Sequence, residues 1–331
     1  MIFLYYSINK KMDIIEQYGE GKKNMIYMAK PVYGGWVTFT AHMALKYGYD
    51  LYKIGKRTEK NKRDYGYSVQ YQNLCITDIT KLPNLFITAI DKHYYEYLEY
   101  FPEGTTIVIH DPTELKAKDS PILKYKDKLR FITIRETVQE FLRKGYGIQS
   151  TFKVHPFYGY ERGDSCEDIK CVSISRIDFD KNTDILLRAN MKLPKELQIA
   201  LFGAENRLYV HHKLQKLNIG EHWKGKFKKS YPLLHEEKDI LRGAKYMIDM
   251  STIKNDGGGT QYTFLEAIHN GCVLILNEDW VKRGKTFIDG INCISVKNED
   301  DIVRILTEDK DHSKIIIESQ KLLKRHIDVL W

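Results

Sequence analysis

The stretch that most constrains the fold runs from Asp256 to Asn277. It opens with three glycines, continues as an amphipathic segment of helical length that carries Glu266, and closes with the apolar run 273–276. Glycines let the backbone turn sharply and bring its N–H groups close to a ligand. A helix that begins directly after them offers further N–H groups and a positive dipole end. The pattern predicts a loop, helix and buried parallel strand of an α/β protein, with or without an anion bound at the loop.

Alternation of strand and helix runs through both halves of the chain. In the first half, apolar segments of strand length occupy 25–28, 85–89, 106–109 and 131–134. After a stretch rich in Gly, Pro and aromatic residues (145–160), the alternation starts again at residue 171. Two such series predict an α/β protein with two Rossmann-like domains facing a cleft. The expected divisions are an extension without an assigned role at 1–24, a first domain at 25–155, a second at 156–315 and a C-terminal helix at 316–331.

Composition and missing motifs argue against several classes of protein. The five cysteines include no Cys-x-x-Cys pair and none has a histidine at ligand spacing, which favours reduced thiols in the cytoplasm and argues against zinc. The apolar opening 1–6 is too short to span a membrane, so no membrane partner is expected. A formal charge of +8 is compatible with a polyanionic partner without requiring one. The first strand is not followed by Gly-x-Gly-x-x-Gly, which argues against an NAD enzyme.

Two short segments of the first half are candidate site residues. Gly34 and Gly35 follow the first predicted strand and leave room for a ligand beside its end. His110 and Asp111 follow the strand at 106–109, and open α/β sheets place functional residues at the carboxyl ends of strands. Asp111 could position an acceptor hydroxyl or accept its proton. It could equally cap the next helix after an Asp-Pro turn.

Two groups of cations are candidate anion-binding residues. The first is a basic stretch with a single acidic residue, formed by Lys53, Lys56, Arg57, Lys60, Lys62 and Arg63. It is either a solvated loop or a patch that contacts nucleic-acid phosphates. The second is Arg176 with Lys181, five positions apart on the polar loop after a predicted strand. As a pair they could neutralise a diphosphate, whereas each alone would be an ordinary surface charge.

The second half resembles the retaining GT-B glycosyltransferases, two-domain enzymes that use nucleotide-sugar donors. The resemblance extends over residues 175–296, and its segments occur in the order found in that family: 175–181, 202–206, 257–272 and 288–296. It implies a GT-B fold with an acceptor-binding first domain and a donor-binding second domain. It also implies a reaction that needs no bound metal and retains the anomeric configuration.

The same resemblance assigns residues to the donor. The diphosphate would be bound by Arg176, Lys181, Gly257, Gly258, Gly259 and Thr260. The ribose and the rest of the nucleotide would be bound by Glu266, Gly203, Gln261 and Tyr262. Gly34 and Gly35 would border the donor sugar and phosphate. The family often has a second glutamate where this chain has Gly258, so the identity of the sugar stays open.

Three segments are also similar to the DNA α-glucosyltransferases of T-even bacteriophages: 26–39, 108–113 and 262–266. Asp111 matches the proposed catalytic Asp of that family, and His110 stands beside it. This similarity implies UDP-glucose as donor, a hydroxymethylated base in double-stranded DNA as acceptor, and a cytoplasmic location, in a host cell if the protein is viral. The basic stretch at 53–63 would then contact DNA. A glycan, lipid or protein acceptor, or a non-catalytic DNA-binding protein on the same fold, are the alternatives.

Overall fold

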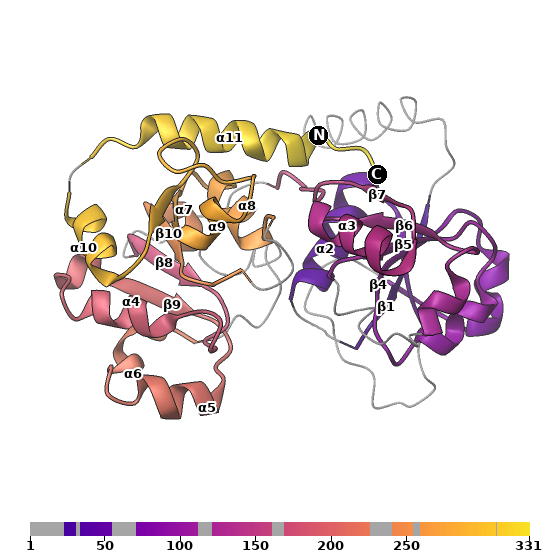
Figure 1. The fold of residues 1–331 in the computed structure, drawn as a ribbon, viewed down its shortest axis with the longest axis horizontal. Helices are drawn as coiled ribbons and strands as arrows, with labels where there is room; N and C mark the ends of the chain where they lie inside the picture. The colour runs from indigo at the N-terminus through magenta and orange to yellow at the C-terminus, as the bar shows by residue number, and fades with distance from the viewer. Residues whose placement is uncertain are drawn as a thin grey trace, which may run out of the picture.

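Two β-sheets with helices packed on their faces form the two lobes of the molecule (Figure 1). The structure is a computed structural model that describes residues 23–30, 34–54, 71–111, 121–160, 169–225, 240–253, 259–308 and 310–331. Neighbouring strands in both sheets pair in parallel. Parallel sheets are covered on both faces, which explains why the predicted strands are continuous apolar runs.

Among the described residues, the first sheet has seven strands in the order β3-β2-β1-β4-β5-β6-β7. They are β1 (Asn24–Met28), β2 (Asp50–Ile54), β3 (Gln72–Leu74), β4 (Leu85–Ile90), β5 (Thr106–Ile109), β6 (Arg130–Thr133) and β7 (Ser150–Phe152). The helices of this domain are α2 (Gly35–Tyr47) and α3 (Glu136–Tyr146), with 3₁₀ turns η2 (Ile76–Lys81), η3 (Tyr95–Tyr100) and η5 (Pro121–Tyr125). Every residue of β1 and β4 is buried, as their sequences predict.

Three strands of this sheet differ from the sequence-based expectation. β7 lies within the stretch 145–160 that was expected to be irregular, and it is a short, partly exposed edge strand without an apolar run. β2 includes the start of the basic stretch, and β3 is mostly exposed. The edge strands β3 and β7, and β2 beside β3, carry polar residues and so lack the continuous apolar signal that identifies buried parallel strands.

The second sheet has five described strands in the order β12-β11-β10-β8-β9. They are β8 (Cys171–Ile174), β9 (Ile199–Phe202), β10 (Tyr246–Asp249), β11 (Val273–Asn277) and β12 (Ile294–Val296). The helical elements are α4 (Thr183–Asn190), η6 (Lys195–Leu197), α5 (Arg207–Tyr209), η7 (Val210–Leu214), α6 (Ile219–His222), α7 (Ile240–Gly243), α8 (Tyr262–His269), α9 (Glu278–Lys282), α10 (Glu299–Thr307) and α11 (Ser313–Asp328). The predicted helix and buried strand after the glycine run are confirmed as α8 and β11.

Helix α11 returns the chain from the second lobe to the first (Figure 1). It begins three residues before the predicted start at 316 and ends at Asp328. The segment after it packs on the first domain. Val329 accepts hydrogen bonds through its carbonyl from Lys46 Nζ (2.8 Å) and from the Tyr47 hydroxyl (2.5 Å). No helix in the described part of the chain is long and apolar enough to cross a lipid bilayer.

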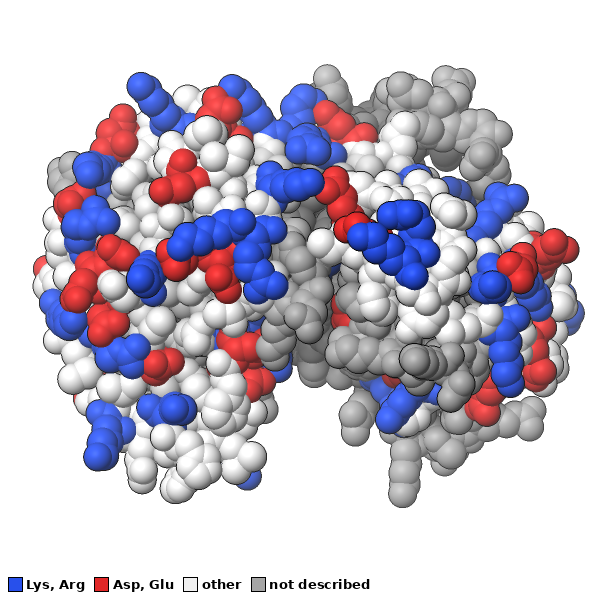
Figure 2. All heavy atoms as spheres, viewed as in Figure 1, with Lys and Arg blue, Asp and Glu red and all other residues white. Residues whose placement is uncertain are grey.

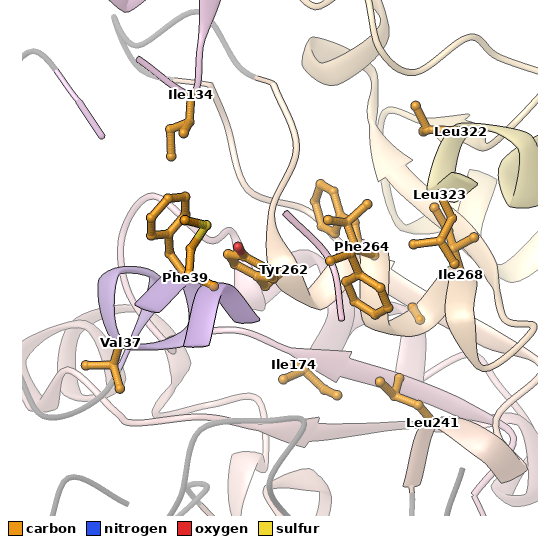
Figure 3. Packing of buried hydrophobic residues seen from close by; sticks show 14 of the residues in the cluster. Val37, Phe39, Ile134, Ile174, Leu241, Tyr262, Phe264, Ile268, Leu322 and Leu323 are labelled. Carbon is orange, nitrogen blue, oxygen red and sulfur yellow. The ribbon is translucent and has the colours of Figure 1, made fainter. Parts of the chain in front are cut away.

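One hydrophobic cluster continues from the first domain into the second. Phe39 of α2, Tyr262 of α8 and Phe264 of α8 are all buried within it, and Figure 3 shows Tyr262 between the two phenylalanines. His42 of α2 stacks on Tyr262 with ring centroids 4.5 Å apart. The junction between the domains is therefore a packed apolar contact, which positions the strand ends of one sheet relative to those of the other.

Candidate functional site

The start of α2 is the first part of the candidate site. Gly34, which precedes the helix, has φ of +102°, a conformation that favours glycine. A Cβ at either Gly34 or Gly35 would meet no atom within 4 Å, so both glycines border open space. The first turn of α2 thus leaves the room that the sequence predicted beside the first strand. A contact with donor sugar or phosphate at these glycines stays a prediction.

His110 lies at the end of β5 and is buried. Its Nε2 lies 2.7 Å from the Thr88 carbonyl oxygen, and because that oxygen can only accept, Nε2 carries the proton. Burial lowers the pKa of His110 to about 4, while the bond to Thr88 opposes the shift. At neutral pH the imidazole is therefore uncharged, with Nδ1 as an acceptor. Asp111 follows it directly and is partly exposed, so of the two predicted residues Asp111 is the more accessible to an acceptor.

Arg176 and Lys181 lie together in the structure, on the loop after β8 where both line one small pocket. Arg176 is 61% exposed, and its guanidinium bonds Asp178 (2.6 Å) and Asp180 (3.5 Å). These carboxylates orient the arginine and also offset its charge. A diphosphate bound here would therefore compete with Asp178 and Asp180 for the guanidinium.

Gly203 has a different role from the predicted one. A Cβ at this position would lie 1.8 Å from the Ser175 carbonyl oxygen, so only glycine fits where the loops after β8 and β9 cross. Its N–H donates to the Gly225 carbonyl (3.0 Å), and its carbonyl accepts from Trp223 Nε1 (3.0 Å). With both backbone groups engaged in the fold, Gly203 does not offer them to a nucleotide.

The loop before α8 is described from Gly259 onward, so the predicted contacts of Gly257 and Gly258 lie outside the described residues. Gly259 has φ of +110°, Thr260 is buried, and Gln261 occupies the N-cap position of α8. Glu266 is also buried, on the second turn of the helix. Its predicted contact with the ribose hydroxyls remains a prediction.

Tyr262 requires a correction. Its hydroxyl donates to the Pro156 carbonyl (3.0 Å), and its ring is buried against His42 and His155. The side chain therefore belongs to the domain junction and is not available to the nucleotide. The helical pattern alone could not reveal this, because the partner residues lie more than 100 positions away.

The predicted basic patch is only partly described. Lys53 lies in β2, is 4% exposed, and has its ammonium 3.3 Å from the ring centroid of Tyr71. A lysine in that position is not accessible to DNA phosphates, which corrects the prediction for this residue. The other members of the patch, Lys56, Arg57, Lys60, Lys62 and Arg63, lie outside the described residues.

Arg135 is a further candidate site residue that no sequence motif singles out. It follows β6 at the carboxyl end, the same position relative to its strand that His110 and Asp111 occupy after β5. A Cβ at Gly259 would lie 3.4 Å from Arg135 Cγ, so the arginine reaches the loop of the opposite domain. In the sequence, only its position directly after an apolar strand segment indicates that Arg135 belongs to the site. In the described ranges, no group of three or more His, Cys, Asp or Glu side chains could hold a metal ion.

Together, two Rossmann-like domains with parallel sheets, candidate residues at the strand ends and a returning C-terminal helix define a GT-B fold. Solved structures share it. Anabaena Alr3699/HepE in complex with UDP has 12% sequence identity and a TM-score of 0.62, over 93% of this chain and 96% of that one. A glycosyltransferase from Rickettsia africae ESF-5 has 13% identity and a TM-score of 0.58, over 93% and 95%.

S. aureus TarM is a more partial match, with 15% identity and a TM-score of 0.51 over 74% of this chain and 52% of that one. At such identities the likeness establishes the fold alone. No protein-family model matches the sequence. No curated protein matches the sequence either.

Proposed function

We propose that this chain is a glycosyltransferase that uses a nucleotide-sugar donor, UDP-glucose. The observation that carries the proposal is the placement of Arg176 and Lys181 on one loop, between the carboxyl end of β8 and α4, within a GT-B fold. Anabaena HepE, which shares the fold over nearly its whole length, was solved with UDP, with UDP and glucose, and with UDP-glucose. An arginine can bind a phosphate through two parallel hydrogen bonds, and a neighbouring lysine adds a second positive charge for a diphosphate.

In this proposal the second domain holds the donor. Arg176 and Lys181 bind the diphosphate, assisted by backbone N–H groups of the loop before α8 and by the helix dipole. Glu266 accepts hydrogen bonds from the ribose hydroxyls. As the bond between the anomeric carbon and the diphosphate oxygen breaks, its electron pair stays with the diphosphate, and the two cations stabilise the growing negative charge.

The first domain supplies the acceptor side. Asp111 orients the acceptor hydroxyl and accepts its proton as the new bond to the anomeric carbon forms. Neutral His110, fixed by Thr88, keeps the end of β5 in place beside Asp111. By resemblance the anomeric configuration is retained, and the charge stabilisation by Arg176 and Lys181 needs no resident metal.

For the acceptor we propose a hydroxymethylated base in double-stranded DNA, flipped out of the helix to reach the site. The similarity of segments 26–39 and 108–113 and the formal charge of +8 support this. On the face shown in Figure 2, basic and acidic side chains are interspersed over both domains. The proposed DNA contact is therefore the basic stretch 56–63 of the first domain, which lies outside the described residues. A glycan is the second candidate, because TarM was solved with Fondaparinux and α-GlcNAc-glycerol.

The decisive experiment incubates the protein with UDP-glucose and DNA that contains 5-hydroxymethylcytosine or 5-hydroxymethyluracil, followed by mass spectrometry of the nucleosides. Unmodified DNA and the Asp111→Asn variant are the controls. We expect a mass increase of one hexose on a hydroxymethylated base, and none with either control. UDP release that depends on an oligosaccharide, with no change to either base, would replace DNA by the glycan acceptor. No UDP binding at all would overturn the glycosyltransferase proposal.

A further inference from the structure

Arg135, at a strand end of the first domain, has its side chain beside Gly259 of the second domain. It lies between β6 and α3, at the same sheet edge as Asp111. A Cβ at Gly259 would lie 3.4 Å from its Cγ, 3.8 Å from its Cδ and 3.9 Å from its Nε. The arginine side chain therefore lies beside Gly259, three residues before α8 begins. Backbone N–H groups at the N-terminus of a helix are where a donor diphosphate would bind.

The positive charge beside Gly259 comes from Arg135, because the neighbouring histidines His110 and His155 are neutral. Burial is the main reason that the pKa of His110 and the pKa of His155 are lowered, and the nearby positive charge of Arg135 lowers both further. Both imidazoles are therefore neutral at pH 7. A guanidinium keeps its charge in any protein environment and presents a planar fork that matches phosphate oxygens.

We propose that Arg135 is a donor-binding residue supplied by the first domain, whose guanidinium contacts the phosphate groups of the nucleotide sugar at the Gly259 loop. The inference rests on the proposed glycosyltransferase function and adds a third cation to Arg176 and Lys181. Those two come from the domain that holds the nucleotide, whereas Arg135 comes from the domain that holds Asp111. Donor binding would thereby be linked to the relative position of the two domains.

Calorimetry with UDP and with uridine tests this contact. We expect Arg135→Ala to weaken UDP binding roughly tenfold to a hundredfold, as for the loss of a charged hydrogen bond. Uridine lacks phosphates, so its affinity should not change; a general loss of structure would weaken both ligands. Guanidinium ion at millimolar concentration should restore part of the UDP affinity. Arg143→Ala removes an exposed arginine from α3 and should leave UDP binding as in the wild type.

Arg135→Gln provides a second variant, because it keeps part of the side chain against Gly259 while removing the charge. If UDP affinity stays within twofold of the wild type in the folded variants, Arg135 does not contact the phosphates and the inference is overturned, while the proposed function stands. If the wild type itself does not bind UDP, the proposed function fails first and this inference falls with it. Equal weakening of UDP and uridine would assign Arg135 a structural role instead.

Discussion

At the scale of single residues, His42 is shared by both domains. It is fully buried on α2, its Nδ1 accepts from the Tyr158 backbone N–H (2.9 Å), and its ring lies between Phe157 and Tyr262. Burial lowers its pKa to about 3, with smaller contributions from His269 and Lys46. His326 is likewise buried nearby, with its pKa lowered to about 4. Protonation of either ring would place a charge inside the packed junction.

These histidines predict a loss of stability in mild acid. Because the folded pKa of His42 lies below the value of 6.5 expected when unfolded, the unfolded chain binds more protons as the pH falls below 6.5. The contribution of His42 to the free energy of unfolding is therefore complete above pH 6.5, and it is lost as the pH falls from 6.5 toward 3. Between pH 7 and pH 5 the loss from one such group is about 2 kcal/mol. Urea denaturation at a series of pH values measures it.

His42→Asn isolates this contribution, since the amide oxygen can still accept from Tyr158 but does not titrate. We expect a less stable protein whose free energy of unfolding varies less between pH 7 and pH 5. His211→Gln, at an exposed histidine of η7, should leave the slope unchanged. A slope in His42→Asn equal to that of the wild type would show that His42 does not govern the response to pH.

Arg176 provides the second prediction at this scale. Arg176→Ala should weaken UDP binding roughly tenfold to a hundredfold, because a charged hydrogen bond to the diphosphate is lost. Arg188→Ala is the matched control, since Arg188 also pairs with two carboxylates, Asp184 and Glu299, but on α4. Calorimetric titration compares the three proteins. Unchanged UDP affinity in Arg176→Ala would remove Arg176 from the diphosphate site.

At the scale of elements, the sequence predicts those strands and strand ends whose own residues carry the signal. The apolar run 273–276 is β11, and the polar pair after residues 106–109 lies at the carboxyl end of β5. Both predictions need only local patterns, because a strand buried on two faces must be apolar throughout. The short edge strand β7 (Ser150–Phe152) lacks that pattern and was missed.

Side-chain environments set by distant partners could not be predicted in the same way. Tyr262 looked like a site residue beside the glycine run, but Pro156 and His42 enclose it. Lys53 looked like part of a basic loop, but the β2 strand buries it beside Tyr71. Both side chains combine an apolar body with a polar end, so either environment suits their composition. Which one they occupy is decided by tertiary packing.

The crossing of the loops after β8 and β9 yields a prediction for one glycine. Gly203→Ala should destabilise the protein by about 3 kcal/mol or more, because its Cβ would lie 1.8 Å from the Ser175 oxygen at a φ of +150°. Gly290→Ala is the control in the same domain, with φ of +70° and no atom within 4 Å of the added Cβ. It should cost only about 1–2 kcal/mol. Similar urea midpoints for the two variants would contradict this account of Gly203.

At the scale of the whole molecule, two of the contacts between the described parts of the domains are apolar. One is the apolar junction around Tyr262, and the other is the segment after α11, which lies on the first domain. Trp331 is buried there, and the centroid of its ring lies 5.2 Å from that of Phe39 and 5.9 Å from that of Phe86. Its Nε1 donates a hydrogen bond to the Val154 carbonyl (3.1 Å). Because Phe39 also belongs to the junction cluster, the two contacts share one core.

This shared core predicts that Trp331 contributes far more stability than its neighbour. Trp331→Ala removes a buried ring and its hydrogen bond, and should lower the free energy of unfolding by about 3–5 kcal/mol. Leu330 is 52% exposed, and Leu330→Ala should change it by no more than about 0.5 kcal/mol. The two residues are adjacent, so a general effect of altering residues 329–331 would appear in both variants. Equal urea midpoints would show that Trp331 does not fasten α11 to the first domain.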